Sequence, residues 1–366
     1  MYEQDKRIVL TLDAGGTNFV FSAIQGCREV VEPVHRKAVP DSIEQTLAVL
    51  VEGFGEVKKC LTEKPVAISF AFPGPADYAH GVIGDLPNFP AFRGGVAMGP
   101  FLAQQFGLPV FINNDGNLFA YGEALAGMLP AINQRLERSG SPRRYRNLLG
   151  LTLGTGFGGG VVIDGRLLTG DNGCGGDVWL MRNPKYPHFI SEESVSIRAV
   201  LRVYQENTGN TESLSPKDIF DIAEGTRQGN QQAAVQSFHE LGRVAGNAIV
   251  HALDIVDGMV VIGGGVAGAA KYILPGIMEE IQQPVGKFSG ERFPCLQMDV
   301  FNLEDPDGLS TFLKETDAEV KIPYGDLTVP YIAHKKVGIA VSTLGTSRAI
   351  SIGAYAFALA QLDREK

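Results

Sequence analysis

The chain has 366 residues, of which 44% are hydrophobic and 20% are charged, and its formal net charge is -9. This length exceeds what one hydrophobic core usually organises, so we expect two domains. The acidic balance argues against a general nucleic-acid binder, because phosphate backbones are held by clustered Lys and Arg side chains.

Membrane and disulfide-rich classes are also disfavoured. No apolar run approaches the ~20 residues that a membrane helix needs, and residues 1–7 lack the apolar core of a signal peptide. The four cysteines are scattered and form no CxxC pair, so neither a disulfide framework nor a structural zinc site is indicated. We therefore expect a cytoplasmic protein with no membrane partner.

The first third of the chain alternates strands and helices. Residues 7–13 read as a strand that ends in a glycine turn, and residues 19–24 as the returning strand. Asp41 or Ser42 caps a helix, and residues 65–72 read as a buried strand. A further strand at 109–113 leads into a helix that starts near Asn117. This alternation predicts an α/β domain.

The remainder begins with an arginine-rich stretch, residues 129–147, which we interpret as an exposed hairpin or loop. Residues 284–342 read as irregular, and a helix over about 347–362 ends the chain. Between these stretches a second α/β block is predicted. Its expected strands are 148–153, 161–168 and 259–262, and its expected helices lie within 191–206, 215–224, 231–253 and 269–282.

Two segments resemble each other. Residues 10–17 and 151–158 each combine an apolar strand, a Gly/Thr hairpin turn and the start of a returning strand. Two related halves are predicted.

Each of these turns is a candidate phosphate-binding loop, because glycine allows backbone N–H groups to converge on phosphate oxygens. The carboxylate of Asp13 could organise a magnesium ion, directly or through water. For either turn alone, an ordinary hairpin is the alternative. The candidate phosphate ligands are Asp13, Gly15, Gly16, Thr17 and Asn18 in the first turn, and Gly154, Thr155 and Gly156 in the second.

Two other nucleotide-binding motifs are common in α/β proteins. No GxxxxGK[ST] sequence occurs, which excludes a P-loop. The GxGxxG pattern occurs twice, beginning at Gly154 and at Gly263, but the first copy precedes a strand and the second lacks an acidic strand end ~20 residues on. A dinucleotide-dependent oxidoreductase therefore remains an alternative.

Asp115 is the candidate general base. It follows an apolar strand and precedes a helix, where open α/β sheets present functional groups. Phosphoryl transfer to an alcohol needs such a carboxylate to accept the hydroxyl proton. Alternatively, Asp115 only caps the helix near Asn117. The local sequence leaves both interpretations open.

Taken in order, these motifs resemble the ROK group of sugar kinases and sugar-responsive regulators, within the actin-like ATPase superfamily. The resemblance rests on residues 13–18, 72–75, 86–89, 114–117, 153–160 and 261–266. It implies two actin-like (ribonuclease H-like) α/β domains flanking a deep cleft, with ATP and Mg²⁺ as cofactors and a homodimer. It also implies Asp115 as base, Gly264 and Gly265 as nucleotide ligands, and Asn88, Asn114 and Asp177 as sugar ligands.

One departure from the family pattern concerns metal binding. The usual Gly-Glu-x-Gly-His core is replaced by residues 176–180, in which Asp177 can still accept a hydrogen bond but Leu180 cannot replace a histidine ligand. No zinc site is expected.

The expected domains are residues 1–115, rejoined by the helix at 346–366, and residues 116–345.

The leading hypothesis is ATP-dependent phosphorylation of a hexose or N-acetylhexosamine hydroxyl, with a small sugar as partner and no nucleic acid. A sugar-sensing regulator of the same family is the second hypothesis. It would need a DNA-reading module, and the first strand is expected to begin near Arg7.

Overall fold

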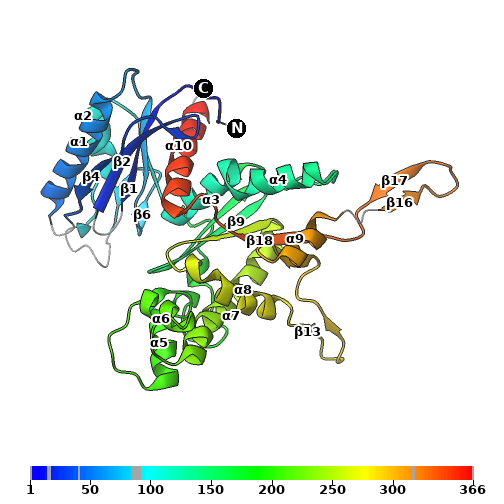
Figure 1. Ribbon diagram of the computed structural model, residues 1–366. Coiled ribbons are helices and arrows are strands. Elements are labelled where there is room, and N and C mark those ends of the chain that lie inside the picture. Colours follow the sequence, from blue (N-terminus) through cyan, green and yellow to red (C-terminus); the bar gives the residue numbers. More distant parts are fainter. Residues whose placement is uncertain (1, 15–17, 40–41, 85–91, 315–317, 365–366) are drawn as a thin grey trace. The chain divides into compact units, whose positions relative to one another are not determined.

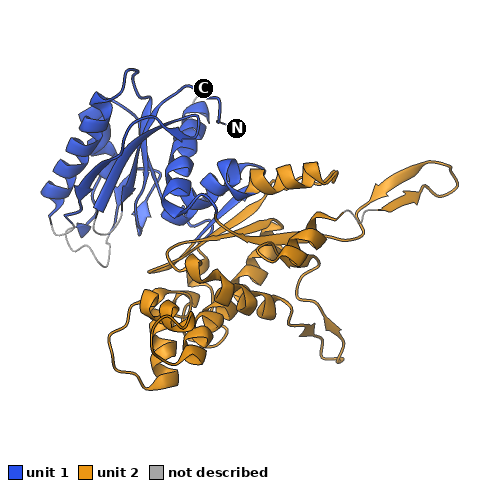
Figure 2. Ribbon diagram, in the orientation of Figure 1, with its two compact units in different colours: residues 1–128, 159–176, 343–366 blue, residues 129–158, 177–342 orange. Residues whose placement is uncertain are grey.

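The computed structural model describes residues 2–14, 18–39, 42–84, 92–314 and 318–364, which form two compact units (Figure 2). Unit 1 comprises residues 1–128, 159–176 and 343–366, and unit 2 comprises residues 129–158 and 177–342. These units are groups of mutual contacts, and the domain division at residue 115 stays a prediction.

Unit 1 is built on a sheet with the order β3-β2-β1-β5-β8, in which β4 also pairs with β2. Figure 1 labels β1, β2 and β4 of this sheet. Strands β1 and β2 are antiparallel, whereas β1, β5 and β8 are parallel. A separate two-stranded ladder joins β6 and β7. The strands are β1 (Val9–Ala14), β2 (Asn18–Gln25), β3 (Arg28–Glu29), β4 (Val34–Lys37), β5 (Ala67–Ala71), β6 (Ala76–Asp77), β7 (Val82–Ile83) and β8 (Val110–Asn113).

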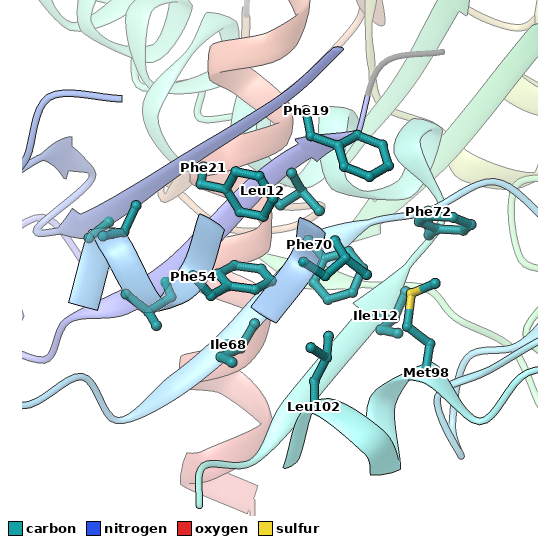
Figure 3. Packing of buried hydrophobic residues seen from close by; sticks show 14 of the residues in the cluster. Leu12, Phe19, Phe21, Phe54, Ile68, Phe70, Phe72, Met98, Leu102 and Ile112 are labelled. Carbon is teal, nitrogen blue, oxygen red and sulfur yellow. The ribbon is translucent and has the colours of Figure 1, made fainter. Parts of the chain in front are cut away.

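Aromatic side chains fill the core of unit 1 (Figure 3). The ring of Phe21 from β2 meets Phe54 of α1 (Ile43–Lys59) edge-on at 5.0 Å, and Phe70 from the fully buried β5 lies beside Phe54. Helix α2 (Met98–Phe106) adds Met98 and Leu102 to the same cluster. The side chain of Ser42 accepts the N–H of Gln45, which confirms Ser42 as the predicted cap of α1.

Two further helices of unit 1 pack so closely that their backbones are in contact. In α3 (Asp115–Ala126), a Cβ added to Gly122 would lie 1.9 Å from the carbonyl oxygen of Ala349. In α10 (Thr346–Arg364), a Cβ added to Gly353 would lie 1.9 Å from the carbonyl oxygen of Leu118. Helix α10 also packs on β1, β5 and β8. These two glycines therefore let α3 and the C-terminal helix close against each other.

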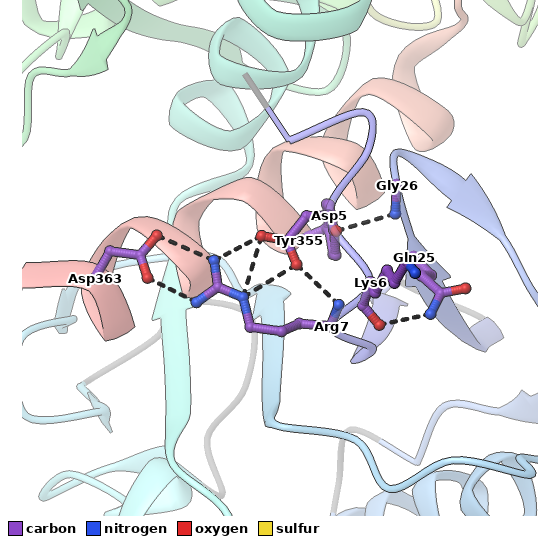
Figure 4. Close-up of polar contacts among 7 residues, drawn as sticks. All are labelled: Asp5, Lys6, Arg7, Gln25, Gly26, Tyr355 and Asp363. Atoms are coloured by element: carbon purple, nitrogen blue, oxygen red, sulfur yellow. Dashed lines mark hydrogen bonds and ion pairs between the residues drawn. The ribbon is translucent and has the colours of Figure 1, made fainter.

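Polar contacts fasten α10 to the segment before β1 and to the turn after β2 (Figure 4). The guanidinium of Arg7 donates to Asp363 at 2.7 Å and to Asp5 at 2.7 Å. The hydroxyl of Tyr355 accepts the N–H of Gly26 at 3.0 Å. The carboxylates of Asp363 and Asp5 hold the pKa of Arg7 above its ordinary value, so this cation stays charged.

Unit 2 is centred on β9, β12, β18 and β15, which belong to a sheet with the order β11-β10-β9-β12-β18-β15. The pairings β9–β12, β12–β18 and β15–β18 are parallel. The two sheets have similar strand orders. In the first, β3-β2-β1 is followed by β5 and β8, and in the second, β11-β10-β9 is followed by β12, β18 and β15. This similarity agrees with the predicted relation of two halves. The strands are β9 (Leu148–Leu153), β10 (Phe157–Ile163), β11 (Arg166–Leu167), β12 (Met259–Gly263), β15 (Asp299–Asn302) and β18 (Lys336–Val341).

The helices of unit 2 centre on α7. A Cβ added to Gly242 of α7 would lie 2.2 Å from the carbonyl oxygen of Ile273 in α8, so the two helices pack closely at this glycine. Among the described residues, no helix is both long and apolar enough to cross a membrane. Helices α5 (Ile197–Thr208), α6 (Pro216–Ala223) and α8 (Ala270–Ile281) pack against α7 (Gln231–Val256). Short 3₁₀ turns are η2 (Val178–Leu180), η3 (Ser191–Glu193) and η4 (Ala267–Ala269).

The arginine-rich stretch at 129–147 was predicted to be an exposed hairpin or loop, which is wrong for its first half, whereas residues 139–147 form no helix or strand. Helix α4 (Met128–Arg138) occupies its first half. Leu129, Ile132 and Leu136 are buried, and their spacing of three and four places them on one helical face. Of the arginines in the stretch, the helix carries only Arg135 and Arg138, both in its last turn. These charges concealed the apolar face of the amphipathic helix in the sequence.

Residues 284–342 were predicted to be irregular, and this was also wrong. The apolar strand β18 pairs with β12 and β15 inside the sheet of unit 2. The remaining elements are short, which explains why a period was not visible in the sequence. They are β13 (Val285–Gly286), β14 (Arg292–Phe293), α9 (Pro306–Leu313), β16 (Ala318–Lys321) and β17 (Thr328–Tyr331).

The α3–α10 contact yields a stability prediction. Gly122→Ala should lower the free energy of unfolding by about 1–3 kcal/mol, because the added methyl group overpacks a backbone contact. Gly55→Ala in α1 is the matched control: nothing lies within 4 Å of its added Cβ, so it should be neutral or stabilise by up to about 1 kcal/mol. Denaturant unfolding measures both. Equal stability of the two variants would show that the close packing is not required.

Candidate active site

Three parallel strands of unit 1 end at one edge of its sheet. The register pairs Leu12 with Phe70 and Phe70 with Ile112, so the ends of β1, β5 and β8 are level. Asp13 lies near the end of β1, and Asp115 follows β8 by two residues. Carboxyl ends of parallel strands are where open α/β sheets present functional groups. The fold therefore brings both predicted carboxylates to the same edge.

Asparagines fix the turn that carries Asp115. The buried Asn113 accepts the backbone N–H of Asn114 at 2.8 Å and the side-chain amide of Asn117 at 3.0 Å. The side chain of Asn114 accepts the N–H of Gly116 at 2.8 Å and is the N-cap of α3. The alternative in which Asp115 caps a helix near Asn117 is therefore wrong: Asp115 is the first helical residue. The role of Asn113 was not predicted.

The electrostatic surroundings of Asp115 favour its protonated form. Burial raises the pKa of Asp115 above 3.8, and the negative charge of Asp13 raises it further. Hydrogen bonds from the backbone N–H groups of Gly116 and of Asp115 itself act in the opposite direction. The side chain nevertheless remains exposed. Its surroundings are thus crowded but open to water, which suits a group that exchanges a proton with a bound molecule.

Glycines allow the start of α3 to sit directly on a neighbouring backbone. A Cβ added to Gly116 would lie 2.6 Å from the carbonyl oxygen of Gly159, and one added to Gly160 would lie 2.5 Å from the carbonyl oxygen of Gly116. Any larger residue here would displace the turn that holds Asp115. Part of the glycine run at 154–160 therefore serves packing.

Several predicted ligands of unit 1 lie outside the described residues. Gly15, Gly16 and Thr17 of the first turn and the sugar ligand Asn88 are among them. Asn18 is described and begins β2 with an exposed side chain. Of the candidate phosphate ligands in the first turn, the structure therefore describes only Asp13 and Asn18.

Unit 1 also contains a cavity of about 690 Å³ beside β8. Its lining includes Phe111 and Asn113, residues 76–80 and 169–173, and part of α10. Asn114 and Asp115 are not among the lining residues, so this cavity does not define the candidate active site.

The two predicted nucleotide turns of unit 2 lie side by side. The turn after β9 is closed by the N–H of Gly154, which donates to the carbonyl oxygen of Gly156 at 3.0 Å. Gly264 has a φ of 92°, and its added Cβ would lie 2.3 Å from the carbonyl oxygen of Leu153. Only glycine suits that position. The parallel pairing of β9 with β12 thus brings together the predicted ligands Gly154, Thr155, Gly156, Gly264 and Gly265.

An ion pair braces the first of these turns. Glu192 accepts the N–H of Phe157 at 3.0 Å, and Arg198 donates to the carbonyl oxygen of Thr155 at 3.2 Å. The same guanidinium donates to Glu192 at 3.3 Å. Sequence reasoning missed both residues, because they lie about 40 positions from the turn and carry no motif of their own. Thr155 itself stays exposed.

The predicted sugar ligands come from different units. Asn114 belongs to unit 1, whereas Asp177 belongs to unit 2 and is exposed just before η2. Leu180 is 54% exposed in the position where the family pattern has histidine. Within the described ranges, no group of three or more His, Cys, Asp or Glu side chains could hold a metal ion. Magnesium needs only one or two carboxylates when phosphates and waters complete its shell, so Asp13 fits that requirement.

Comparisons with known proteins agree with this architecture. The model of the ROK family matches residues 9–309. The chain is 27% identical to a glucokinase of Thermotoga maritima over 75% of this chain and 86% of the relative. It is 28% identical to an N-acetyl-D-glucosamine kinase of Vibrio vulnificus over 75% and 88%.

A solved glucokinase from Parabacteroides distasonis is 56% identical and covers 98% of this chain and 99% of its own, with a TM-score of 0.88. The predicted α/β architecture with two actin-like domains is confirmed by this likeness. Because the family model spans most of the sequence, the chain belongs to the ROK family.

Proposed function

We propose that this chain transfers the γ-phosphoryl group of ATP to a hydroxyl of a hexose or N-acetylhexosamine, with Asp115 as general base. The proposal rests on the arrangement at the first turn of α3, where Asn114 is the N-cap and Asp115 is the first helical residue. The carboxylate of Asp115 is exposed and shares its sheet edge with Asp13.

The names of the relatives support the substrate class. Glucokinases and N-acetylglucosamine kinases align with most of the chain. A ROK glucokinase from Streptomyces griseus, which shares the fold at 19% identity and a TM-score of 0.60, was solved in complex with glucose and AMPPNP. These observations favour ATP as phosphoryl donor and leave glucose and N-acetylglucosamine as the first acceptors to test.

Asp115 is oriented by its own helix. The N–H of Gly116 holds one carboxylate oxygen at 2.8 Å, which leaves the second oxygen to accept the proton of a sugar hydroxyl. The cap role of Asn114 engages its side-chain oxygen, so its amide N–H group remains able to donate to a neighbouring hydroxyl. Asp177 is the third proposed contact, as an exposed acceptor.

The nucleotide is assigned to the glycine turns. Backbone N–H groups at residues 154–156 and 264–265 offer donors to the phosphates and the nucleoside, with residues 15–18 as the proposed counterpart in unit 1. Bound Mg²⁺ would neutralise the charge of the β and γ phosphates, and Asp13 is the residue that would hold it.

We further infer a homodimer, on the family resemblance.

Replacement of the Asp115 carboxylate tests its role as general base. Asp115→Asn should lower kcat by about 10²- to 10⁴-fold, because the amide keeps the shape but accepts no proton. The affinity for ATP should change little. Coupled ADP release with glucose and N-acetylglucosamine measures the first quantity, and calorimetric titration with ATP the second.

Asp164→Asn is the matched control. Asp164 is exposed in the turn after β10, at a φ of 49° that Asn also tolerates. It should retain wild-type kcat. Normal turnover by the Asp115→Asn protein would remove Asp115 from the mechanism.

The pH dependence of kcat/KM tests the raised pKa of Asp115. A base must be ionised in the free enzyme, so kcat/KM should fall as the pH drops through the pKa of Asp115. Because burial and Asp13 raise that pKa above 3.8, the acid limb should be centred above 3.8. The pH profile of kcat/KM measures its midpoint. A limb centred at or below 3.8 would contradict the raised pKa or the role of Asp115.

A further inference from the structure

A hairpin of unit 2, formed by β16 and β17, reaches away from the rest of that unit (Figure 1). Every residue of both strands is exposed, and the two strands pack mainly against each other. An isolated two-stranded hairpin is marginally stable in water, whereas three or more strands with an apolar face can be stable. The hairpin therefore lacks the packing that such an element normally needs.

One face of this hairpin is apolar. The register pairs Ala318 with Tyr331 and Val320 with Val329, and residues directly opposite share a face. The next pair is set by the N–H of Ile322, which donates to the carbonyl oxygen of Leu327 at 2.8 Å. The other face carries Glu319, Lys321, Thr328 and Pro330. The exposed apolar face consists of Ala318, Val320, Ile322, Leu327, Val329 and Tyr331.

The two edges of the hairpin differ. Because Ile322 bonds to Leu327, the alternation of an antiparallel ladder directs the main-chain groups of Val320 inward and those of Glu319 and Lys321 outward. The outward groups of β17 belong to Thr328 and Pro330. Proline has no N–H, so the β17 edge is blocked for further pairing. The edge of β16 is open.

We propose that β16 pairs antiparallel with β16 of a second copy of this chain, across a two-fold axis through Val320. This register places Glu319 opposite Lys321 of the second copy, and Lys321 opposite Glu319 of the second copy. Each such pair joins opposite charges and exchanges both main-chain hydrogen bonds. The result is a four-stranded sheet in which the two apolar faces become continuous.

The strand itself points to a second copy of this chain as occupant. A two-fold contact requires a self-complementary surface, and residues 318–322 read apolar, acidic, apolar, basic, apolar about Val320. Moving the axis to Glu319 or to Lys321 would place like charges opposite each other, which is destabilising. The charge pattern thus selects one register. The proposal does not depend on the proposed catalytic function.

Charge reversal tests the pairing. Glu319→Lys and Lys321→Glu should each weaken dimerisation by about tenfold or more, since every cross-strand pair then joins like charges. The double variant Glu319→Lys/Lys321→Glu should restore dimerisation. Sedimentation velocity over a range of protein concentrations measures the dissociation constant.

The control is Asp326→Lys, which changes the net charge as much as Glu319→Lys but lies in the loop between the strands. It should dimerise like the wild type. Two results would overturn the proposal: a wild-type protein that is monomeric at tens of micromolar, or single variants that dimerise as tightly as the wild type. The latter would leave a homodimer through another surface intact.

Cross-linking tests the position of the axis. A Val320→Cys pair would form a non-hydrogen-bonded antiparallel pair, whose Cα separation of about 4.5 Å permits a disulfide. The exposed Cys60 and Cys174 are first changed to serine. Mild oxidation should then give a covalent dimer with Val320→Cys but not with Thr328→Cys on the blocked strand. Equal cross-linking of both, or of neither, would contradict the pairing.

Discussion

The parallel pairing of β1, β5 and β8 is the constraint on which the candidate site depends. It brings the ends of three strands level, so that Asp13 and Asp115 face the same edge although 101 residues separate them. Two carboxylates near each other raise the cost of ionising both. The register of the sheet thus contributes to the raised pKa of Asp115. The hydrogen bonds of Asn113 and Asn114 fix the turn that carries Asp115.

Glycines also allow α3 to approach the backbones of α10 and β10 closely. The α3–α10 contact needs Gly122 and Gly353, and the start of α3 needs Gly116 and Gly160. These contacts place the helix that carries Asp115 against β10 and against the C-terminal helix. In a chain with 45 glycines, many therefore serve packing, while those at 154–156 and 264–265 remain the candidates for nucleotide contact.

Strong local patterns allowed the sequence to predict much of the fold. The strand at β8, the capped helix α1 and the long helix α7 follow from apolar periodicity and cap residues. The helix α4 was missed because its arginines masked an apolar stripe. The hairpin of β16 and β17 was missed because its strands have four residues each.

The site was predictable to a smaller extent. Asp115 could be placed at a strand end, but whether it caps the helix depends on a boundary of one or two residues, which sequence patterns do not fix. Glu192 and Arg198 reach the turn at Thr155 through tertiary packing alone. The relation of Asp13 to Asp115 follows from strand order, which emerges only when the sheet is assembled.

A titration of the Asp115 carboxyl group by ¹³C NMR, in the wild-type protein and in Asp13→Asn, tests the influence of Asp13 on Asp115 most directly. We expect a pKa above 3.8 in the wild type and a lower pKa in the variant, because the neighbouring negative charge is removed. A wild-type pKa at or below 3.8, or a pKa that does not fall in Asp13→Asn, would contradict this expectation.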